Sequence, residues 1–349
     1  MTEPLVSVVI PTFNRSWLVQ RAVESALLQT HRRVQVIVVD DGSADDTEVA
    51  IKDRFGNEER VTYLRTENCG PAAARNAGLI EVAGSHLALL DSDDEWMTWK
   101  LEFQLECLGR VPEVGMVWTD MTAVDADGDV VAERHLRTMY RRYREIDLDE
   151  VMAGSLPIDH PQAGEGRLWH GDLYRAMIGG NLVHTSTVLL TRERLERVGH
   201  FDETLQRTGE DFDFHLRTCA AGQVALADVP SIRWRVGAPD QLTRADLMPQ
   251  MARNHLTTVA KAIDRDQGRL TEADRRLALA GAHGWLGEEL LEAGLRAEAA
   301  GHLKSALRGR RRARALALLL VAKLPVRLGS AVRRLVGGLT RPFRRGAAG

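Results

Sequence analysis

The chain has 349 residues, of which 44% are hydrophobic and 27% charged, as in an ordinary soluble globular protein with room for a sizeable core and more than one domain. The formal net charge of -3 hides an asymmetry, because residues 299–349 contain 13 Lys and Arg and no Asp or Glu. An acidic body with a net charge of -16 is thus joined to a basic tail, a contrast that bears on partners rather than on fold.

Cysteine usage and hydropathy argue against several classes of protein. The three cysteines, Cys69, Cys107 and Cys219, are far apart, which argues against a thiolate metal site and indicates a reducing compartment. Residues 5–10 form a strand pattern with no charged leader before it, so we expect no signal peptide. The longest late apolar run, residues 315–322, is too short to span a bilayer.

Strand patterns alternate with helix patterns at the start of the chain. Strands are predicted at residues 5–10, 34–39, 61–65 and 86–90, where β-branched and other apolar side chains run together. An amphipathic helix is predicted at residues 16–29 and a second helix, capped by Ser43 or Asp45, near residues 47–55. A third helix opens at Gly70 and Pro71, a typical helix entry. This alternation predicts a right-handed, mostly parallel α/β sheet.

Polar side chains follow three of these strands where each strand ends. In chain order they are Asn14 and Arg15, then Asp40 and Asp41, then Asp91, Asp93 and Asp94. Ligands of open parallel sheets bind just beyond the carboxyl ends of the strands, and clustered carboxylates usually need a cation or solvent nearby. No glycine-rich phosphate-binding motif occurs. The pattern favours a nucleotide whose phosphates sit on a metal ion, although Asp94 by itself suits a helix N-cap.

Further along the chain the patterns are mixed. A helix is predicted at residues 98–108, a strand at 114–119 and a hairpin at 124–131. Residues 137–150 read as a surface helix or loop, and residues 157–171 as an excursion rich in Pro, Gly and His. A polar loop and a strand are predicted over 180–190 and a short helix over 193–198. Glu210 and Asp211 then begin a helix, where a purely structural role beside the helix dipole stays open.

Five short motifs occur in the order and spacing of one enzyme family. They are Val6-Ser-Val-Val-Ile-Pro-Thr-Phe-Asn14, Val38-Val-Asp-Asp-Gly-Ser43, Ala74-Arg-Asn-Ala-Gly78, Asp91-Ser-Asp-Asp94 and Gly209-Glu-Asp211. From about Leu5 to Thr243 the chain resembles glycosyltransferase family 2, with its GT-A fold. The resemblance implies inverting transfer of a sugar from a nucleotide-diphosphate sugar, with a UDP-sugar favoured. The acceptor would be a hydroxyl of a glycan or lipid-linked molecule, in surface polysaccharide or glycoconjugate synthesis.

The resemblance also implies which residues hold the donor. The base and ribose would be held by Asp41 and by the stretch Pro11, Thr12, Phe13, Asn14 and Arg15. Gly70 would support the nucleotide, with Arg75 near the diphosphate or paired to an aspartate. Asp91-Ser92-Asp93 matches the D-x-D motif, in which Asp91 would contact the ribose or a metal-bound water and Asp93 would ligate Mn²⁺ or Mg²⁺.

The same resemblance assigns the chemistry of the acceptor. Asp211 would be the base that deprotonates the acceptor hydroxyl, and Glu210 would orient the acceptor or the backbone. Family members often carry a later histidine that assists at the metal. Here that position falls on Arg235 or Val236, so the resemblance supplies no histidine there. Arg233 or Arg235 could instead neutralise the leaving diphosphate.

The last third of the chain differs from the rest. We expect a glycosyltransferase domain over residues 1–245 and a helical region over 246–309. Helices predicted at 271–293 and 295–307 would brace the first domain, with a tetratricopeptide-like pair as the alternative. Residues 310–349 alternate basic and apolar side chains, which fits an anionic membrane surface, with a solvated basic tail as the alternative.

These patterns together predict a cytoplasmic enzyme that lies peripherally on the inner face of the cell membrane. The acidic body and the lack of interleaved aromatic residues argue against nucleic acid as a partner. One function from a different class stays open. It is a catalytically silent nucleotide-sugar-binding or scaffold protein that acts through its C-terminal helices.

Overall fold

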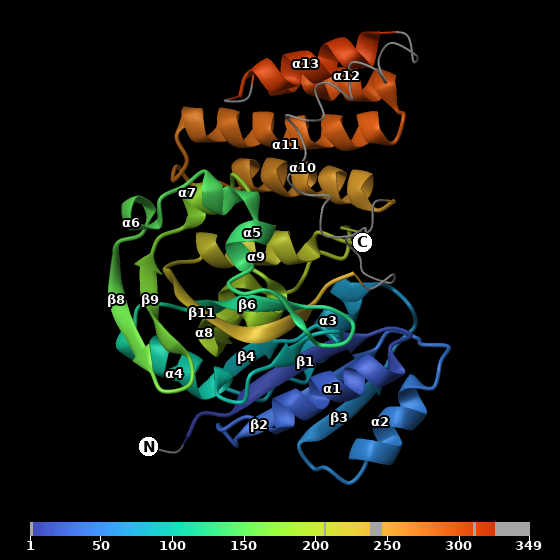
Figure 1. The fold of residues 1–349 in the computed structure, drawn as a ribbon, viewed down its shortest axis with the longest axis vertical. Helices are drawn as coiled ribbons and strands as arrows, with labels where there is room; N and C mark the ends of the chain where they lie inside the picture. Colours follow the sequence, from blue (N-terminus) through green and yellow to red (C-terminus); the bar gives the residue numbers. More distant parts are fainter. Residues whose placement is uncertain (1–2, 206, 238–245, 310–311, 325–349) are drawn as a thin grey trace. The chain divides into compact units, whose positions relative to one another are not determined.

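The structure is a computed structural model that describes residues 3–205, 207–237, 246–309 and 312–324 (Figure 1). The chain divides into two compact units. The first comprises residues 1–177 and 181–236, and the second comprises residues 178–180 and 237–349. Among the described residues, every strand belongs to the first unit and the helices α10 to α13 belong to the second.

The strands of the first unit form one mixed sheet. Their bounds are β1 Val6–Thr12, β2 Val34–Asp40, β3 Val61–Arg65, β4 His86–Leu89, β5 Glu95–Trp96, β6 Met116–Val124, β7 Val130–Ala132, β8 Gly154–His160, β9 Gly164–Gly171, β10 Leu189–Thr191 and β11 Val224–Arg235. The order across the sheet is β3-β2-β1-β4-β10-β6-β11-β9-β8, with β5 paired to β11 and β7 paired to β6.

Strand direction explains where the polar strand ends gather. Strands β3, β2, β1 and β4 are parallel, with Val6 opposite Val34 and Thr12 opposite Asp40 in the β1–β2 pair. Their carboxyl ends therefore meet at one edge of the sheet. Strand β10 runs antiparallel to β4 and to β6, while β6 and β11 are parallel. The predicted α/β sheet is confirmed as a mixed sheet, which is parallel from β3 to β4 and between β6 and β11, while the other described strand pairs are antiparallel.

Helices flank this sheet (Figure 1). Their bounds in the first unit are α1 Ser16–Leu27, α2 Thr47–Phe55, α3 Pro71–Ile80, α4 Lys100–Arg110, α5 Leu136–Met139, η1 Arg141–Arg144, α6 Leu148–Val151, α7 Tyr174–Met177, η2 Thr185–Thr187, α8 Arg192–Val198 and α9 Glu210–Ala220. Gly78 lets α3 lie close to the sheet, because a Cβ there would come within 2.5 Å of Val9 Cγ1. The glycine of the Ala74–Gly78 motif is thus required by packing.

Two predictions for the middle of the chain are corrected. Residues 157–171 are not an irregular excursion but part of the antiparallel hairpin β8–β9, which extends the sheet beyond β11. The pairing of Trp169 with Leu226 joins this hairpin to the sheet, a contact that the local run of Pro and Gly does not reveal. The strand predicted at 114–119 continues to Val124, and all nine residues of β6 are buried.

The second unit is a stack of helices. They are α10 Met248–Asp264, α11 Glu272–Glu292, α12 Arg296–Ala306 and α13 Arg312–Lys323. The predicted hairpin of helices is confirmed, with a capping box at Thr271 and a break at Gly294, whose φ of +81° suits glycine. Fully buried Leu290 and Leu303 form the centre of its core.

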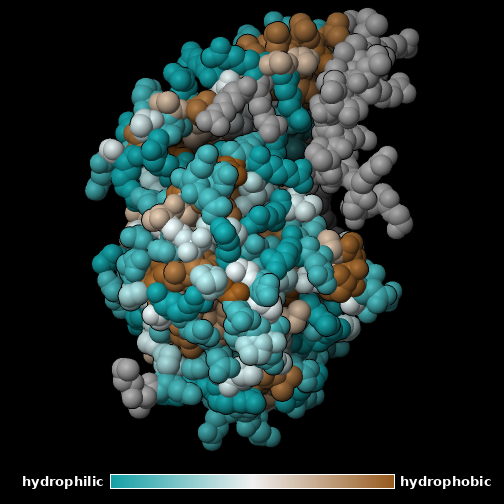
Figure 2. Space-filling model, turned by 60° about the vertical axis from the view of Figure 1, so that its left-hand side comes forward, coloured by the Kyte–Doolittle hydropathy of each residue, from teal (hydrophilic) through white to brown (hydrophobic). Residues whose placement is uncertain are grey.

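Helix α13 contributes its apolar side chains to that core. Leu318, Leu319 and Val321 are buried in it, so this part of the predicted tail packs on the helical unit. Leu316 and Leu320 remain exposed, and hydrophobic side chains gather over α12 and α13 in Figure 2. Residues 325–349 of the predicted membrane-binding tail lie outside the described residues. Within the described part of the chain, no helix is both long and apolar enough to cross a membrane.

Candidate active site

The loops after β1 and β2 are tied together at the edge of the sheet. Pro11 and Thr12 end β1, and Phe13 is 44% exposed. Asn14 has a φ of +52° and bridges the two loops, since its N–H donates to Ser43 Oγ at 2.8 Å and its Oδ1 accepts from Ala44 N–H at 2.7 Å. Hydrogen bonds to the loop after β2 therefore fix the conformation of the predicted nucleotide-binding stretch.

Asp41 organises the next part of this edge. Its two carboxylate oxygens accept hydrogen bonds from the backbone N–H groups of Cys69 and Gly70, each at 2.9 Å. Gly70 has a φ of +93° and lies directly before α3. Each carboxylate oxygen can accept a second hydrogen bond, so Asp41 fixes the loop before α3 and retains acceptor capacity for a base.

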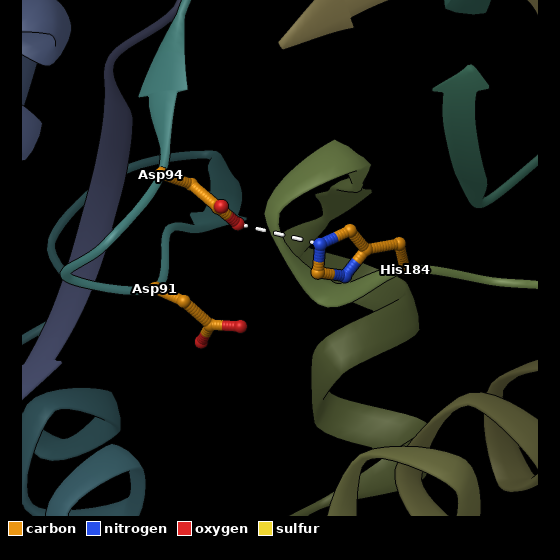
Figure 3. A group of neighbouring side chains, drawn as sticks. All are labelled: Asp91, Asp94 and His184. Atoms are coloured by element: carbon orange, nitrogen blue, oxygen red, sulfur yellow. Dashed lines mark ion pairs between the residues drawn. The ribbon is translucent and has the colours of Figure 1, made fainter. Parts of the chain in front are cut away.

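A carboxylate–imidazole cluster lies beyond β4 (Figure 3). Asp91 and Asp94 come from the loop after β4, and His184 comes from the segment before η2. One ligand atom from each residue lies within 4.8 Å of the others, and His184 Nε2 is 3.3 Å from Asp94 Oδ2. The hydroxyl of Ser186 donates to Asp94 Oδ2 at 2.5 Å and accepts from Asp91 N–H at 3.0 Å.

The placement of Asp94 corrects its predicted role as a helix cap. Helix α4 begins at Lys100 after Trp99, and Asp94 instead turns its side chain inward, where it is 1% exposed. Burial raises the pKa of the Asp94 carboxyl well above its usual range, and the charges of Asp93 and Asp91 raise it further. A buried carboxyl with this environment gains from a nearby cation.

The cluster fits a divalent cation. Asp94 Oδ1 and His184 Nε2 are buried without a hydrogen-bond partner. Burial lowers the pKa of His184 to about 4, which leaves the imidazole neutral and able to ligate a metal at neutral pH. Carboxylate oxygens suit Mg²⁺ and Mn²⁺, and an imidazole ligand is compatible with a transition metal such as Mn²⁺.

Asp93, the predicted metal ligand, has a different partner. Its Oδ1 lies 3.0 Å from Arg15 Nη1, and the same guanidinium is 3.4 Å from Ser92 Oγ. The loop after β1 is thereby joined to the D-x-D segment. The structure thus brings Asp91 together with Asp94 and His184, while Asp93 faces the nucleotide-binding stretch.

Arg75 connects this cluster to the start of α9. It is 5% exposed, and its guanidinium donates to Asp91 Oδ1 at 2.7 Å and to Glu210 Oε1 at 2.6 Å. Although burial raises the pKa of Asp91, Arg75 brings it below its ordinary value. One buried cation therefore holds two carboxylates from segments that lie far apart in the sequence.

Asp211 has the electrostatics of a proton acceptor. It lies half-buried in the first turn of α9, next to Glu210. Burial, followed by the negative charge of Glu210, raises the pKa of Asp211 to about 7. A carboxyl with this pKa is ionised in part at neutral pH and is a stronger base than an exposed aspartate.

The sequence has no histidine at Arg235 or Val236, where the resemblance would place one. The histidine that lies beside the aspartates comes from a different segment. Arg235 donates to the carbonyl of Ala126 and lies over the ring of Trp17, and it is His184 that joins the aspartates. The sequence reasoning missed His184 and Ser186. The available signal was the polar run 184–187 directly before a buried strand, but the antiparallel pairing of β10 with β4 has no local signature.

A family model described as Glycosyl transferase family 2 matches residues 7–160. The chain is 43% identical over 106 residues to a Rickettsia felis protein named as an uncharacterized glycosyltransferase. This match covers 29% of the chain and 17% of that protein, so the chain spans a small part of the relative's length.

Two solved structures resemble the chain in fold. S. aureus TarS 1–349 in complex with UDP-GlcNAc has a TM-score of 0.63 at 16% identity, covering 93% of this chain and 92% of that one. The mannosyltransferase PcManGT from Pyrobaculum calidifontis, in complex with GDP-Man and Mn²⁺, has a TM-score of 0.55 at 19% identity, covering 97% and 81%. The first unit has the GT-A fold of these neighbours. Residues 7–160, which span β1 to β8, are thus similar to glycosyltransferase family 2.

Proposed function

We propose that this chain is a metal-dependent, inverting glycosyltransferase. It would move a sugar from a nucleotide-diphosphate sugar, with UDP-sugars favoured, to a hydroxyl of a glycan or lipid-linked acceptor. The observation that carries the proposal is the buried Arg75 guanidinium, which joins Asp91 to Glu210 beside Asp211. A cluster suited to a cation and a carboxylate suited to a base are therefore held in one network.

Each part of the network has a chemical role in the proposal. Asp91, Asp94 and His184 would hold Mn²⁺ or Mg²⁺, with Asp93 as a further candidate ligand. When bound, such an ion neutralises the charge that develops on a diphosphate leaving group. The nucleotide would be held by the stretch from Pro11 to Arg15 and by Asp41.

Asp211 would act on the acceptor. Its carboxylate takes the proton of the acceptor hydroxyl as that oxygen forms a bond to the anomeric carbon. The bond from the anomeric carbon to the diphosphate oxygen breaks at the same time, with its electron pair leaving on the diphosphate. Attack from the face opposite the leaving group inverts the configuration of the sugar.

The proposal is tested by donor binding and turnover. A thermal-shift screen of UDP-sugars and GDP-sugars with Mn²⁺ identifies the donor, and nucleotide release in the presence of acceptors measures transfer. Asp211→Asn should bind the donor like the wild type and lose transfer. Retained transfer by Asp211→Asn would exclude Asp211 as the base. Donor binding by the wild type without any transfer would favour the catalytically silent alternative.

We also propose peripheral attachment to the inner face of the cell membrane. Residues 325–349 contain six arginines and no acidic residue, and each basic residue near an anionic surface contributes about 1 kcal/mol. Deleting residues 325–349 leaves α13 in its core and should abolish sedimentation with anionic vesicles. Neutral vesicles serve as the control. Equal sedimentation of both proteins with anionic vesicles would refute the membrane contact.

A further inference from the structure

A groove runs along α1 beside the candidate active site. It has a volume of about 430 Å³, and its walls come from the second half of α1, from residues 95–99 and from Arg233 on β11. Glu95 directly follows Asp94 of the carboxylate–imidazole cluster. Because two residues of extended chain span at most about 7 Å, the groove begins close to Asp93. From Arg21 to Leu28 it follows α1 for about 10 Å.

The floor of the groove is rigid. Trp96 N–H donates to Ser25 Oγ at 3.1 Å, and Met97 N–H donates to the carbonyl of Ser231 at 2.8 Å. The ring of Trp96 is packed against the amine of the fully buried Lys100, at 4.1 Å from the ring centroid. A bound molecule would therefore meet a preformed surface and would not have to order the loop.

One arginine of the groove has no carboxylate partner among the described residues. Arg21 pairs with Glu95 at 2.6 Å, and Glu24 pairs with Arg54 at 2.9 Å. Arg233 is opposite Glu95 in the β5–β11 pair and is exposed, yet no carboxylate of the described residues lies within ion-pair distance of it. The carboxylate best placed to neutralise Arg233 is already bound by Arg21.

We propose that this groove binds an anionic stretch of the acceptor glycan, with Arg233 contacting a carboxylate or phosphate of that stretch. The proposal rests on the proposed transferase function and adds the chemical class of the acceptor. Arginine suits this contact because its planar fork donates two hydrogen bonds to either anion. The extended groove next to Asp94 fits a chain molecule better than a free ion.

Oxidation of Met97 by peroxide reports on the groove directly, because Met97 is half-buried in its floor. The full chain is titrated with a short unsulfated chondroitin oligosaccharide, a ribitol-phosphate oligomer and carboxyl-reduced chondroitin. We expect at least one anionic oligomer to slow the oxidation of Met97, and the neutral oligomer to have no effect. The two anionic arms distinguish a carboxylate from a phosphate. Met251 in α10, which is also half-buried, is the internal control.

Substitutions test whether the protection of Met97 from oxidation depends on Arg233. Arg233→Ala should raise the oligomer concentration that half-protects Met97 about tenfold or more, because a charge-assisted hydrogen bond is lost. Arg233→Lys should retain part of the protection, and Arg197→Ala should retain all of it, since Arg197 pairs with Glu193 within α8. Unchanged oxidation of Met97 with both anionic oligomers, or equal protection in Arg233→Ala, overturns the proposal.

Donor binding separates this proposal from the function on which it rests. UDP with Mn²⁺ should raise the Tm of the wild type, the same protein in which the protection of Met97 is measured. A normal shift without protection of Met97 rejects the groove alone. Absence of any nucleotide-dependent shift in the wild type rejects the transferase function itself.

Discussion

Arg75→Ala should destabilise the first unit more than any surface substitution. The side chain is 5% exposed and donates charge-assisted hydrogen bonds of 2.6 and 2.7 Å to Glu210 and Asp91. Removing one partner of a buried ion pair costs about 3–5 kcal/mol, because the remaining charge is left uncompensated. At about 2–4 °C per kcal/mol for a unit of this size, Tm should fall by about 6–20 °C. Arg75→Lys should lose less stability, since an ammonium keeps the positive charge but cannot reproduce the planar, two-pronged geometry of the guanidinium.

Thermal unfolding followed by calorimetry or circular dichroism measures this loss. Arg197→Ala is the control, because its pair with Glu193 is exposed and such pairs contribute about 0–1 kcal/mol. The loss should also depend on pH. Arg75 brings the pKa of Asp91 below its ordinary value, so the pair stabilises the fold at neutral pH and less as pH falls through that lowered pKa. The difference in Tm between Arg75→Ala and the wild type should therefore shrink in acid. A Tm like that of Arg197→Ala at neutral pH would refute the reasoning.

Three further predictions concern the site and the packing beneath it. With a pKa of about 7 for Asp211, kcat/KM should rise about tenfold between pH 5 and 6 and level off above pH 8, and a flat profile would contradict its role as base. His184→Ala should weaken Mn²⁺ binding at least about tenfold in a titration with donor present, and unchanged affinity would remove it from the ligand set. Gly78→Ala should cost about 1–3 kcal/mol in a denaturant melt, because its Cβ would overlap Val9, and an unchanged midpoint would show that α3 shifts freely.

The parts of the fold that sequence predicted are those with strong local patterns. Apolar β-branched runs such as Val34–Asp40 marked the parallel strands, and the entry at Gly70 and Pro71 marked α3. Strands β8 and β9 were missed because their apolar side chains are few and their partner strand β11 lies at a distance in the chain. Local pattern does not encode such long-range pairing.

The residues of the candidate site also fall into those that local patterns predict and those that only the tertiary fold brings together. The ends of the parallel strands alone predict that Asn14, Asp41 and Asp91 lie at one edge of the sheet, as they do. Asp94 and His184 could not be paired from sequence, because they meet only after β10 inserts next to β4 with Leu190 opposite Leu87. The direction of a single side chain, inward for Asp94 and toward Arg15 for Asp93, is likewise a tertiary property.

The position of β6 in the sheet has a consequence for biosynthesis. All nine of its residues are buried, and its long-range partners are β10 and β11, the latter ending 111 residues after Val124. At about 5–20 residues per second, the ribosome needs about 6–22 s to supply that last strand. Until β10 has been synthesised, the short hairpin strand β7 is the only one of the described partners of β6 that is available. A chain cut after residue 160 would keep β6 in that state permanently, so truncated forms should aggregate where the full chain folds.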